Sequence, residues 1–368
     1  MQKKQLAAAI CAGLMLGFGA GMLPANMSPC PSAVVYAAKA QTLTVDATKK
    51  SHGKTYQTIG EALKKAKPGA VIQVMPGTYR EKVMVNVPDL TLVGQDAKTT
   101  TIVWNDAEGT PLRAGDKNGN NTTYKMECAT VKITEKAKNF QAVGITFAND
   151  FPTEQARATK STKSPQAFAI TDEADTSSFY NCRFLGRQDT VYANAGRQYY
   201  KDCYIEGDVD FIFGQASAAV FENCEIHSLA RAVKMDGKSH GMGYVTAPST
   251  LASDKGFLFY QCHLTSDIPA PHYAMLGRPW HPSSEQREVN SAAAFVYCQM
   301  DTPFKERGWN SMKNKFGVFE SQDNRLYEYK NTGKGAKQGE LRPQISDVDA
   351  ANYTPAVYLG DWKPAKRA

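Results

Sequence analysis

Three equally spaced cysteines constrain the fold of this chain more than any other feature. Cys182, Cys203 and Cys224 are each 21 residues apart. An aromatic residue stands three positions before each of them, an apolar residue two positions after, and an amide or acid directly before. The aromatic and apolar positions recur around Cys262 and Cys298, at longer spacings that leave room for inserted loops. Five copies of one short pattern predict a repeat protein.

The character of the repeat predicts the fold class. Repeats of roughly 20 residues, made of short alternating strands with no helical pattern between them, are typical of a parallel β-solenoid in which each repeat is one coil. We therefore predict an all-β chain of roughly ten coils with the cysteine column facing inward. Equivalent positions on successive coils should lie side by side, about 4.8 Å apart.

The same period brings polar side chains together. Asp189 and Asp210 are 21 residues apart, so two carboxylates should lie side by side on adjacent coils. The next step of the period leads to Arg231, and one coil back from Gln188, with a slip of one residue, stands Gln166. Two acids, two amides and an arginine are therefore expected on one face.

The amino-terminal residues 1–38 are interpreted as an export signal. Lys3 and Lys4 precede an apolar run at residues 6–23, and an Ala-x-Ala match follows at residues 38–40, with a nearly equal alternative at 35–37. Retention as a membrane anchor is the alternative, which the glycines in the run and the prolines after it disfavour. We predict a signal peptide at 1–38, cleaved near residues 37–40, and a secreted protein, extracellular or periplasmic, with one domain over 39–368.

The charge of the chain indicates an anionic partner. The formal net charge is +7, and it falls to +5 once residues 1–38, with two lysines and no acids, are removed. A modestly basic secreted protein suits an anionic polymer, although net charge informs association and not the reaction.

The cysteines leave two interpretations open. Cysteine buries readily as a small hydrophobic residue, which favours a stack of reduced thiols. Adjacent coils would, however, place Cα atoms about 5 Å apart, within the range of a disulfide, and export permits oxidation. One bridge, either Cys203–Cys224 or Cys182–Cys203, is therefore the alternative to the reduced stack.

Residues 58–66 predict a short amphipathic helix that closes the amino-terminal end of the solenoid. Thr58 and Glu61 match a capping box, apolar residues follow at positions 59, 62, 63 and 66, and Pro68-Gly69 stops the pattern. An end coil without such a cover would expose its hydrophobic interior.

Four stretches are interpreted as excursions from the coils: residues 105–127, 150–164, 229–255 and 266–290. The last two carry Tyr244 and Trp280, and loops that interrupt a solenoid on one side usually build its site. Beyond Asp301 the repeat fades. Residues 347–362 should form one or two helical turns that pack on the carboxyl end.

Five motifs carry a resemblance to a known family: GTYRE at 77–81, QAFAI at 166–170, GRQDT at 186–190, DFIFG at 210–214 and LGRPW at 276–280. With these motifs in order, the chain from about residue 40 onward resembles the pectin methylesterases, which demethylate pectin. The resemblance implies a right-handed parallel β-helix, in agreement with the period. Phe168 and Val191 depart from the residues that many relatives carry, a difference that bears on rate or preference.

The resemblance also implies roles for single residues. Asp210 would be the nucleophile on the C6 methyl ester of galacturonate, and Asp189 the general acid and then base. Gln188 and Gln166 would donate hydrogen bonds to the oxyanion, and Arg278 would hold the Asp210 carboxylate.

Four further residues are expected to bind substrate. Trp280 would line the sugar cleft, and Phe213 and Tyr244 are further candidates. Arg231, placed by the period alone, would contact the carboxylates of a polyanion.

These side chains suffice for ester hydrolysis. An ester needs a nucleophile, a proton for the departing methoxide and neutral donors for the tetrahedral oxyanion. Two carboxylates one coil apart do not both ionise easily, so the pKa of one rises while an arginine keeps the other charged. We expect no metal and no cofactor. The expected partner is methyl-esterified pectin, with no nucleic acid, no membrane in the mature form, and a monomeric state.

Two other classes of function are alternatives. A glycosidase or lyase would also use a solenoid, and acids about 5 Å apart suit a retaining glycosidase, but that reading leaves the two glutamines unexplained. A non-catalytic carbohydrate-binding solenoid is disfavoured because all five motifs keep their polar residues.

Overall fold

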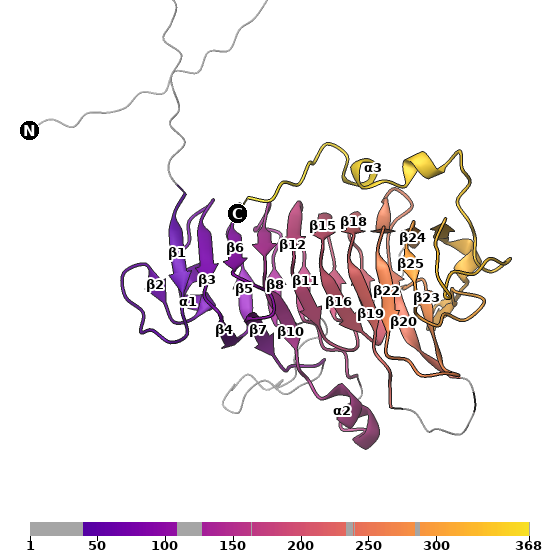
Figure 1. Ribbon diagram of the computed structural model, residues 1–368, viewed down its shortest axis with the longest axis horizontal. Helices are drawn as coiled ribbons and strands as arrows, with labels where there is room; N and C mark the ends of the chain where they lie inside the picture. The colour runs from indigo at the N-terminus through magenta and orange to yellow at the C-terminus, as the bar shows by residue number, and fades with distance from the viewer. Residues whose placement is uncertain are drawn as a thin grey trace, which may run out of the picture. The chain divides into compact units, whose positions relative to one another are not determined.

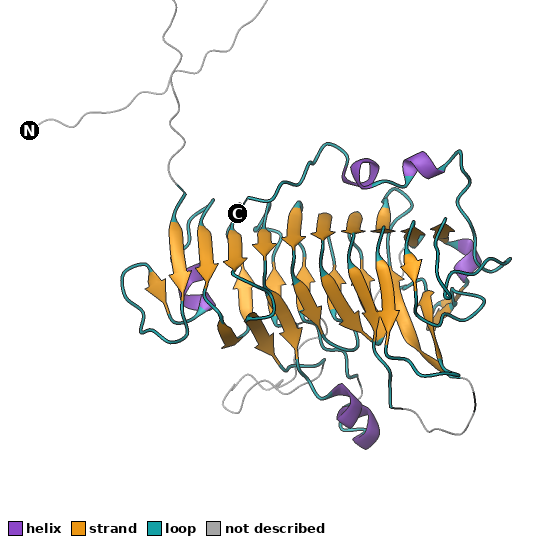
Figure 2. Ribbon diagram, viewed as in Figure 1, coloured by secondary structure: helices purple, strands orange, loops and turns teal. Residues whose placement is uncertain are grey.

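A computed structural model of the chain describes residues 40–108, 127–162, 164–232, 238, 240–283 and 288–367. The predicted signal peptide at 1–38 lies outside these residues, as does most of the predicted excursion at 105–127. From residue 40 onward, short parallel strands wind into successive coils (Figure 1). Helices in the described residues are few and short (Figure 2). The predicted all-β solenoid is confirmed.

The coils form three parallel sheets, named sheets A, B and C, and a complete coil gives one strand to each in turn. Sheet A consists of β2 (Thr55–Tyr56), β1 (Thr42–Val45), β3 (Val71–Val74), β6 (Thr91–Gly94), β9 (Gln141–Val143), β12 (Ser177–Tyr180), β15 (Arg197–Lys201), β18 (Ala218–Glu222), β21 (Gly256–Tyr260), β24 (Ala292–Val296) and β28 (Arg325–Tyr329), in that order. Sheet B consists of β4 (Gly77–Arg80), β7 (Thr100–Trp104), β10 (Thr146–Asn149), β13 (Arg183–Leu185), β16 (Tyr204–Gly207), β19 (Glu225–Ser228), β22 (His263–Ser266) and β25 (Gln299–Met300). Sheet C consists of β5 (Val83–Val85), β8 (Val131–Ile133), β11 (Ile170–Asp172), β14 (Val191–Ala193), β17 (Val209–Gly214), β20 (Gly241–Pro248) and β23 (Tyr273–Gly277).

A column of aromatic rings runs along the interior of the coils at the position three residues before each cysteine. Phe179, Tyr200, Phe221, Phe259 and Phe295 occupy matching positions on neighbouring strands of sheet A. Their rings stack with centroids 4.7, 4.6, 4.8 and 4.3 Å apart. The spacing read from the sequence is therefore the spacing of the coils.

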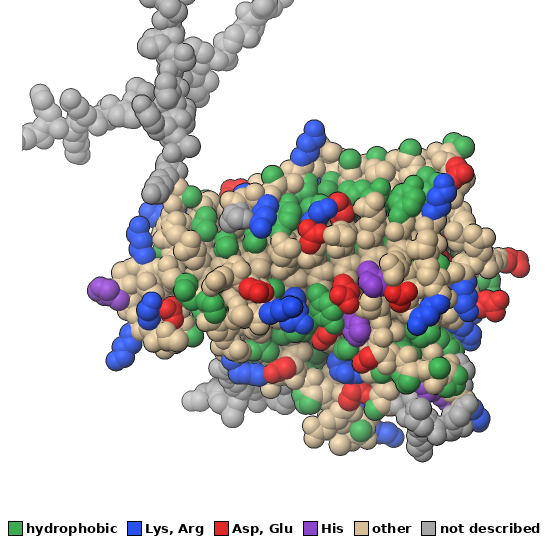
Figure 3. Space-filling model, viewed as in Figure 1, with side chains coloured by type: hydrophobic (Ala, Val, Ile, Leu, Met, Phe, Trp, Pro, Cys, Tyr) green, Lys and Arg blue, Asp and Glu red, His purple; other side chains and the backbone are tan. Residues whose placement is uncertain are grey.

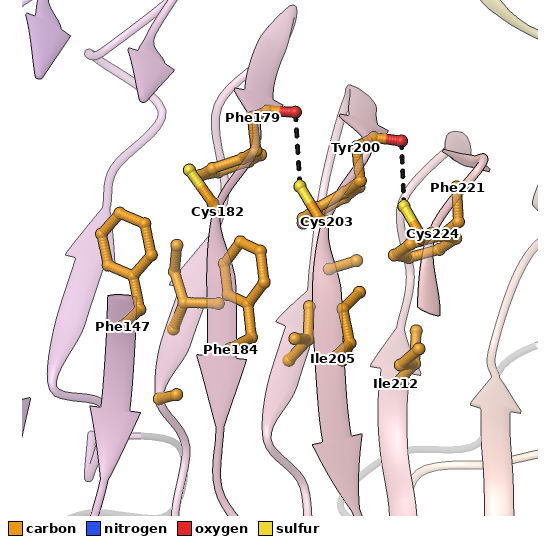
Figure 4. Packing of buried hydrophobic residues seen from close by; sticks show 14 of the residues in the cluster. Phe147, Phe179, Cys182, Phe184, Tyr200, Cys203, Ile205, Ile212, Phe221 and Cys224 are labelled. Atoms are coloured by element: carbon orange, nitrogen blue, oxygen red, sulfur yellow. Dashed lines mark hydrogen bonds between the residues drawn. The ribbon is translucent and has the colours of Figure 1, made fainter. Parts of the chain in front are cut away.

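The cysteines form a second interior column beside the rings. From Cys203 onward each thiol of the column donates to a backbone oxygen one coil back, as Cys203 does to Phe179 at 3.5 Å and Cys224 to Tyr200 at 3.4 Å (Figure 4). All six cysteines in the described residues are buried and free. Burial raises the pKa of the Cys203 thiol well above its usual range. Of the two interpretations left open, the structure therefore has the reduced stack and not the bridge.

The residue before each cysteine makes the corner between sheets A and B. Asn181, Asp202, Asn223, Gln261 and Tyr297 all have φ between 53° and 56°. This left-handed conformation is strained for most residues, and Asn and Asp tolerate it best because their short polar side chains bond locally. The amide or acid that recurs before the first three cysteines therefore suits the corner, although Tyr297 shows that another residue can also adopt its conformation.

Helix α1 (Ile59–Leu63) covers the amino-terminal end of the solenoid, as predicted. Its capping box is formed, with the Thr58 hydroxyl accepting from the backbone N–H of Glu61. The Glu81 carboxylate also accepts from the backbone N–H groups of Ile59 and Gly60, at 2.8 and 2.9 Å. The helix ends at Leu63, earlier than the predicted residue 66. Glu81, in the GTYRE motif, therefore holds this helix.

The predicted excursions contain more regular structure than expected. Residues 150–164 include α2 (Thr153–Thr159), which the sequence analysis missed. The stretches at 229–255 and 266–290 include β20 and β23, which continue sheet C and so shorten the true insertions. A two-stranded antiparallel hairpin, β26 (Met312–Asn314) and β27 (Gly317–Phe319), and the short helix η1 (Ser321–Asp323) lie between β25 and β28, the last strand of sheet A.

The carboxyl-terminal segment folds back along the outer face of sheet A (Figure 1). It contains η2 (Ala350–Asn352) and α3 (Pro355–Leu359), so the predicted helical turns are confirmed. Their predicted place at the carboxyl end of the solenoid is wrong, because α3 packs on β18 and β21 in its middle. Farther along, Gln141 donates to the backbone oxygen of Ala365 at 2.9 Å, and Arg367 donates to the Gln141 side chain at 2.6 Å.

The surface carries both signs of charge. Basic and acidic side chains are interspersed over the face shown in Figure 3. None of the helices formed by the described residues has the length and apolarity needed to cross a bilayer.

Candidate active site

The two acids occupy equivalent positions at the start of adjacent strands of sheet C. Val191 in β14 pairs with Ile212 in β17, so Asp189 and Asp210, each two residues earlier, share a register as the period predicted. Asp189 also donates its backbone N–H to the oxygen of Val209 at 3.1 Å. The acids have φ of 64° and 50° and are 2% and 6% exposed. Two carboxylates are thus buried on adjacent coils.

Glycines make the tight turns that lead into these acids. A Cβ on Gly186 would lie 2.7 Å from the Thr190 hydroxyl, and a Cβ on Gly207 would lie 2.2 Å from the Cβ of Phe211. A side chain at either place would force Thr190 or Phe211, the residue that follows each acid, to shift.

Arg278 holds the Asp210 carboxylate through two hydrogen bonds. Its Nε donates to Oδ1 at 2.9 Å and its terminal nitrogen to Oδ2 at 2.5 Å. The guanidinium lies over the ring of Tyr244, 4.1 Å from the centroid, which fixes it in a cation–π contact. The structure therefore places Arg278 on Asp210, as expected.

Asp189 has a neutral partner. Nε2 of Gln166 donates to its Oδ2 at 2.5 Å. The oxygen of the same amide accepts from the Ser164 hydroxyl at 2.6 Å, so the orientation of Gln166 is set from both ends.

The environments of the two acids affect their pKa values differently. Burial, followed by the negative charge of Asp210, raises the pKa of Asp189 well above its usual range. Burial also raises the pKa of Asp210, but Arg278 opposes that rise. A pair of acids with pKa values pushed apart can supply one proton donor and one charged group at the same pH.

Gln188 stands beside the acids with its oxygen occupied. The terminal guanidinium nitrogen of Arg157 in α2 donates to its Oε1 at 3.1 Å. Its backbone oxygen accepts from Ala167, which directly follows Gln166, at 3.1 Å. The two glutamines therefore lie on neighbouring coils next to the acids, as predicted.

Aromatic side chains form a wall next to this group. The half-buried Trp280 packs edge-on against Tyr192 and Phe213, with centroids 6.2 and 5.5 Å apart. Phe213 is 3% exposed and stacks on Tyr192 at 4.4 Å, so it offers little surface to a sugar and instead supports Trp280. Trp309, another tryptophan, is 1% exposed within the core.

Arg231 does not stack on Asp210. Tyr244 pairs with Val209, because the insertion before β20 delays the next strand of sheet C. Arg231 instead lines a cavity of about 320 Å³ together with Tyr244. The prediction of its place from the period is therefore wrong, although the loop still brings it near the site. The other lining residues are Gly241, Gly243, Tyr273, Met275, Lys305, Arg307 and Asn310.

An ion-pair network behind Gln188 was not foreseen. Arg157 binds Asp208 through two hydrogen bonds, at 2.5 and 2.9 Å, and Arg187 donates to Asp208 at 3.0 Å. The sequence held a signal for half of it, since Arg187 and Asp208 are 21 residues apart. Arg157 had no such signal, because it belongs to an insertion.

The described residues contain no group of three His, Cys, Asp or Glu side chains arranged to bind a metal. Their groups for chemistry are a carboxylate held by an arginine, a second carboxyl with a raised pKa, and two amides on the same face. That set fits nucleophilic cleavage of an ester, and the solenoid around it defines the class as a β-helix esterase.

Comparisons with known proteins give the family. The family model described as Pectinesterase matches residues 44–361. Pectinesterase A of Dickeya chrysanthemi is 35% identical over 360 residues, which cover 90% of this chain and 95% of that protein. Pectinesterase 31 of Arabidopsis thaliana is 33% identical and covers 77% of this chain and 80% of its own. The chain belongs to the pectinesterase family and is a carboxylic ester hydrolase.

Comparison with solved structures leads to the same family. A pectin methylesterase from Erwinia chrysanthemi superimposes with a TM-score of 0.77 at 31% identity, covering 89% of this chain and 99% of that one. A pectin methylesterase in complex with a hexasaccharide gives a TM-score of 0.78 at 31% identity, covering 89% of this chain and all of that one. The predicted right-handed parallel β-helix is confirmed.

Proposed function

We propose that the chain hydrolyses C6 methyl esters of galacturonate in pectin, releasing methanol and leaving pectate, with Asp210 as nucleophile and Asp189 as general acid and base. The observation that carries this assignment is the asymmetry of the two acids. Arg278 binds both oxygens of Asp210, whereas the neutral Gln166 is the one side-chain hydrogen-bond partner of the Asp189 carboxyl group among the described residues. The first is suited to attack as a carboxylate and the second to carry a proton.

The reaction proceeds in two steps. An oxygen of Asp210 attacks the ester carbon, the C–O bond to methoxide breaks, and Asp189 gives its proton to form methanol. The Asp189 carboxylate then takes a proton from water, whose oxygen attacks the acyl carbon. This releases the galacturonate carboxyl group and restores both acids. Splitting the reaction through a covalent intermediate lowers each barrier.

The oxyanion would be stabilised by amide donors. Nε2 of Gln188 makes no hydrogen bond within the described part of the chain, since only its oxygen is engaged. Gln166 uses one N–H on Asp189 and has a second to offer. Neutral donors aimed at developing charge are worth about 10²- to 10³-fold in rate each.

Substrate binding would use the aromatic wall and the basic cavity. Trp280 is half-buried, so part of its side chain is accessible, and Tyr244 contacts Arg278 and lines the same cavity as Arg231. Burial and the neighbouring Arg157 lower the pKa of Arg231, whose Nε has no hydrogen-bond partner among the described residues. Together with Lys305 and Arg307, it would meet a galacturonate carboxylate.

Methylated pectin tests the reaction class. Release of methanol and acid without a fall in viscosity is expected. A fall in viscosity or an unsaturated product would instead identify a depolymerase, and no product would identify a binding protein.

An acylation experiment distinguishes the proposed roles of the two acids from the reverse assignment. With an aryl ester whose leaving group needs no proton, Asp189→Asn should accumulate acyl-enzyme slowly, detected by intact-protein mass spectrometry, and Asp210→Asn should not. Acylation of Asp210→Asn alone would reverse the assignment.

We further propose that residues 1–38 are removed on export and that residues 39–368 act as a single-domain, secreted monomer on pectin, without nucleic acid or membrane contact. Amino-terminal sequencing of protein from the culture medium and light scattering on the purified enzyme test the cleavage site and the monomeric state. Membrane-associated protein with residues 1–38 retained would contradict the first claim, and a dimer mass the second.

A further inference from the structure

We propose that Arg157 in α2 is a positioning residue for ester hydrolysis, because it fixes the amide of Gln188 with both N–H donors turned toward the oxyanion. This inference rests on the proposed role of Gln188 as an oxyanion donor. Arg157 lies outside the five family motifs, in the excursion at residues 150–164.

The chemistry of the contact determines how the amide is oriented. A guanidinium carries only donors, so the Gln188 atom 3.1 Å from the Arg157 nitrogen must be the carbonyl oxygen Oε1. The NH₂ group therefore points away from Arg157. A glutamine without this contact could turn its amide by half a revolution, which would present an oxygen to the oxyanion and repel it.

Arg157 is itself held rigidly. Its two terminal nitrogens donate to the two oxygens of Asp208, at 2.5 and 2.9 Å, and one of them also reaches Glu154 at 2.5 Å. The Asp208 side chain is fully buried, and the Arg157 side chain is 16% exposed. A planar guanidinium bound in this bidentate way has little freedom to rotate.

Asp208, which holds Arg157, lies next to the strand that carries the proposed nucleophile. Asp208 lies two residues before Asp210, and its backbone N–H donates to the oxygen of Arg187 at 2.8 Å. Arg157 thus orients Gln188 relative to the same segment from which Asp210 attacks. Ser164, from the same excursion, donates to the oxygen of Gln166, so one insertion orients both amides.

The first experiment compares Arg157→Met with Arg187→Met in the full-length enzyme. Arg187 is a matched control, since it donates to the same Asp208 but makes no hydrogen bond to the Gln188 side chain within the described residues. Arg157→Met should lower kcat about tenfold with KM unchanged, because a misoriented donor loses transition-state stabilisation. Arg187→Met should stay within about twofold. Equal losses in both variants would overturn the proposal.

A double-mutant cycle with Gln188→Ala measures whether the effect of Arg157 on kcat depends on Gln188. A purely structural role of Arg157 would not produce such a dependence. Gln188→Ala should lower kcat about 10²-fold, and adding Arg157→Met to it should change kcat no further. An undiminished tenfold loss in the Gln188→Ala background would refute positioning while leaving the proposed function intact. Full activity of Gln188→Ala would instead remove the role of Gln188, and with it this inference.

Two more variants show whether a loss of activity comes from loss of the fold. Arg157→Met leaves Asp208 with Arg187 as its charged partner, so Arg157→Met/Asp208→Asn removes the buried charge as well. This double variant should melt close to the wild type and show the kcat loss of Arg157→Met. Arg157→Lys, which keeps a donor and a charge, should recover part of kcat. Wild-type kcat in the folded double variant would contradict the proposal.

Discussion

The ring column on sheet A and the acid pair at the start of β14 and β17 in sheet C are built by the same 21-residue period, but stacking has opposite effects in them. Phe179, Tyr200 and Phe221 gain contacts from being placed on equivalent positions of adjacent coils. Asp189 and Asp210 lose free energy there, because burial and mutual repulsion both oppose their ionisation.

The difference shows what a solenoid must add in order to carry chemistry. Neutral groups can be stacked coil upon coil with no further support. Buried charged groups need partners of opposite charge. Arg187 partners Asp208 from within the repeat, but Arg278, the partner of Asp210, comes from the loop after β23. The regular coils provide the spacing of the acid pair, and an irregular segment provides its compensating charge.

Removing the nucleophile should give the largest effect at the acid pair. Asp210→Asn should lower the rate of methanol release by roughly 10⁴-fold, the scale on which loss of a central catalytic group acts. Asp301→Asn, at an exposed acid that binds His263, is the control and should keep full activity. More than a few per cent of wild-type activity in Asp210→Asn would refute nucleophilic attack by this residue.

Removing one ring should give the largest effect in the ring column. Phe221→Ala should lower the free energy of unfolding by about 3–5 kcal/mol, measured by urea denaturation, because the cavity lies between two stacked neighbours. The activity of the folded fraction should be unchanged. Phe316, which is 41% exposed, is a matched control whose replacement by Ala should cost less than about 1 kcal/mol. Similar losses for both would mean that the stack adds little.

The repulsion between the acids should appear in how stability depends on pH. The folded protein raises the pKa of Asp189 above its unfolded value of about 3.9, so it binds more protons than the unfolded chain does. This contribution therefore destabilises the protein progressively as pH rises above that value, until the folded pKa is passed. Asp189→Asn lacks it, and its melting temperature should exceed that of the wild type by more at pH 7 than at pH 4. An equal difference in melting temperature at the two pH values would show that the pKa of Asp189 is not raised in the folded protein.

The smallest effect is expected from a single thiol. Cys203→Ala should cost about 1 kcal/mol of unfolding free energy, measured by urea denaturation, and leave activity intact, since the thiol contributes packing and one weak hydrogen bond. A reductant should leave the melting temperature of the wild type unchanged because the described cysteines are free. A large drop with reductant would indicate a bridge in solution.

The sequence was informative where the period operates without interruption. The cysteine and ring columns from Phe179 to Cys224, and the pairing of Asp189 with Asp210, follow from equal spacing on uninterrupted coils. The prediction for Arg231 was wrong for the same physical reason, since an insertion before β20 breaks the count.

Contacts made by inserted or terminal segments could not be read in this way. Arg157 reaches Gln188 only because α2 folds against the coils, and α3 lies on β18 and β21 through packing between residues far apart in the chain. Local patterns predicted that α3 exists, but no spacing encodes the surface on which a distant segment comes to rest. The motifs, in contrast, identified Arg278 despite its place in a loop.

The carboxyl-terminal segment also changes how the solenoid should respond to force. In a simple stack each coil touches its neighbours only, so the end coils could peel away one after another. Here Arg367 donates to the backbone oxygens of Leu90 and Asn139, and Gln141 binds Ala365, across more than 220 positions of sequence. Tension on the carboxyl-terminal residues is therefore carried first to the early coils that these residues contact. The last coils are loaded only after those contacts break, so peeling should begin at a higher force than in a simple stack.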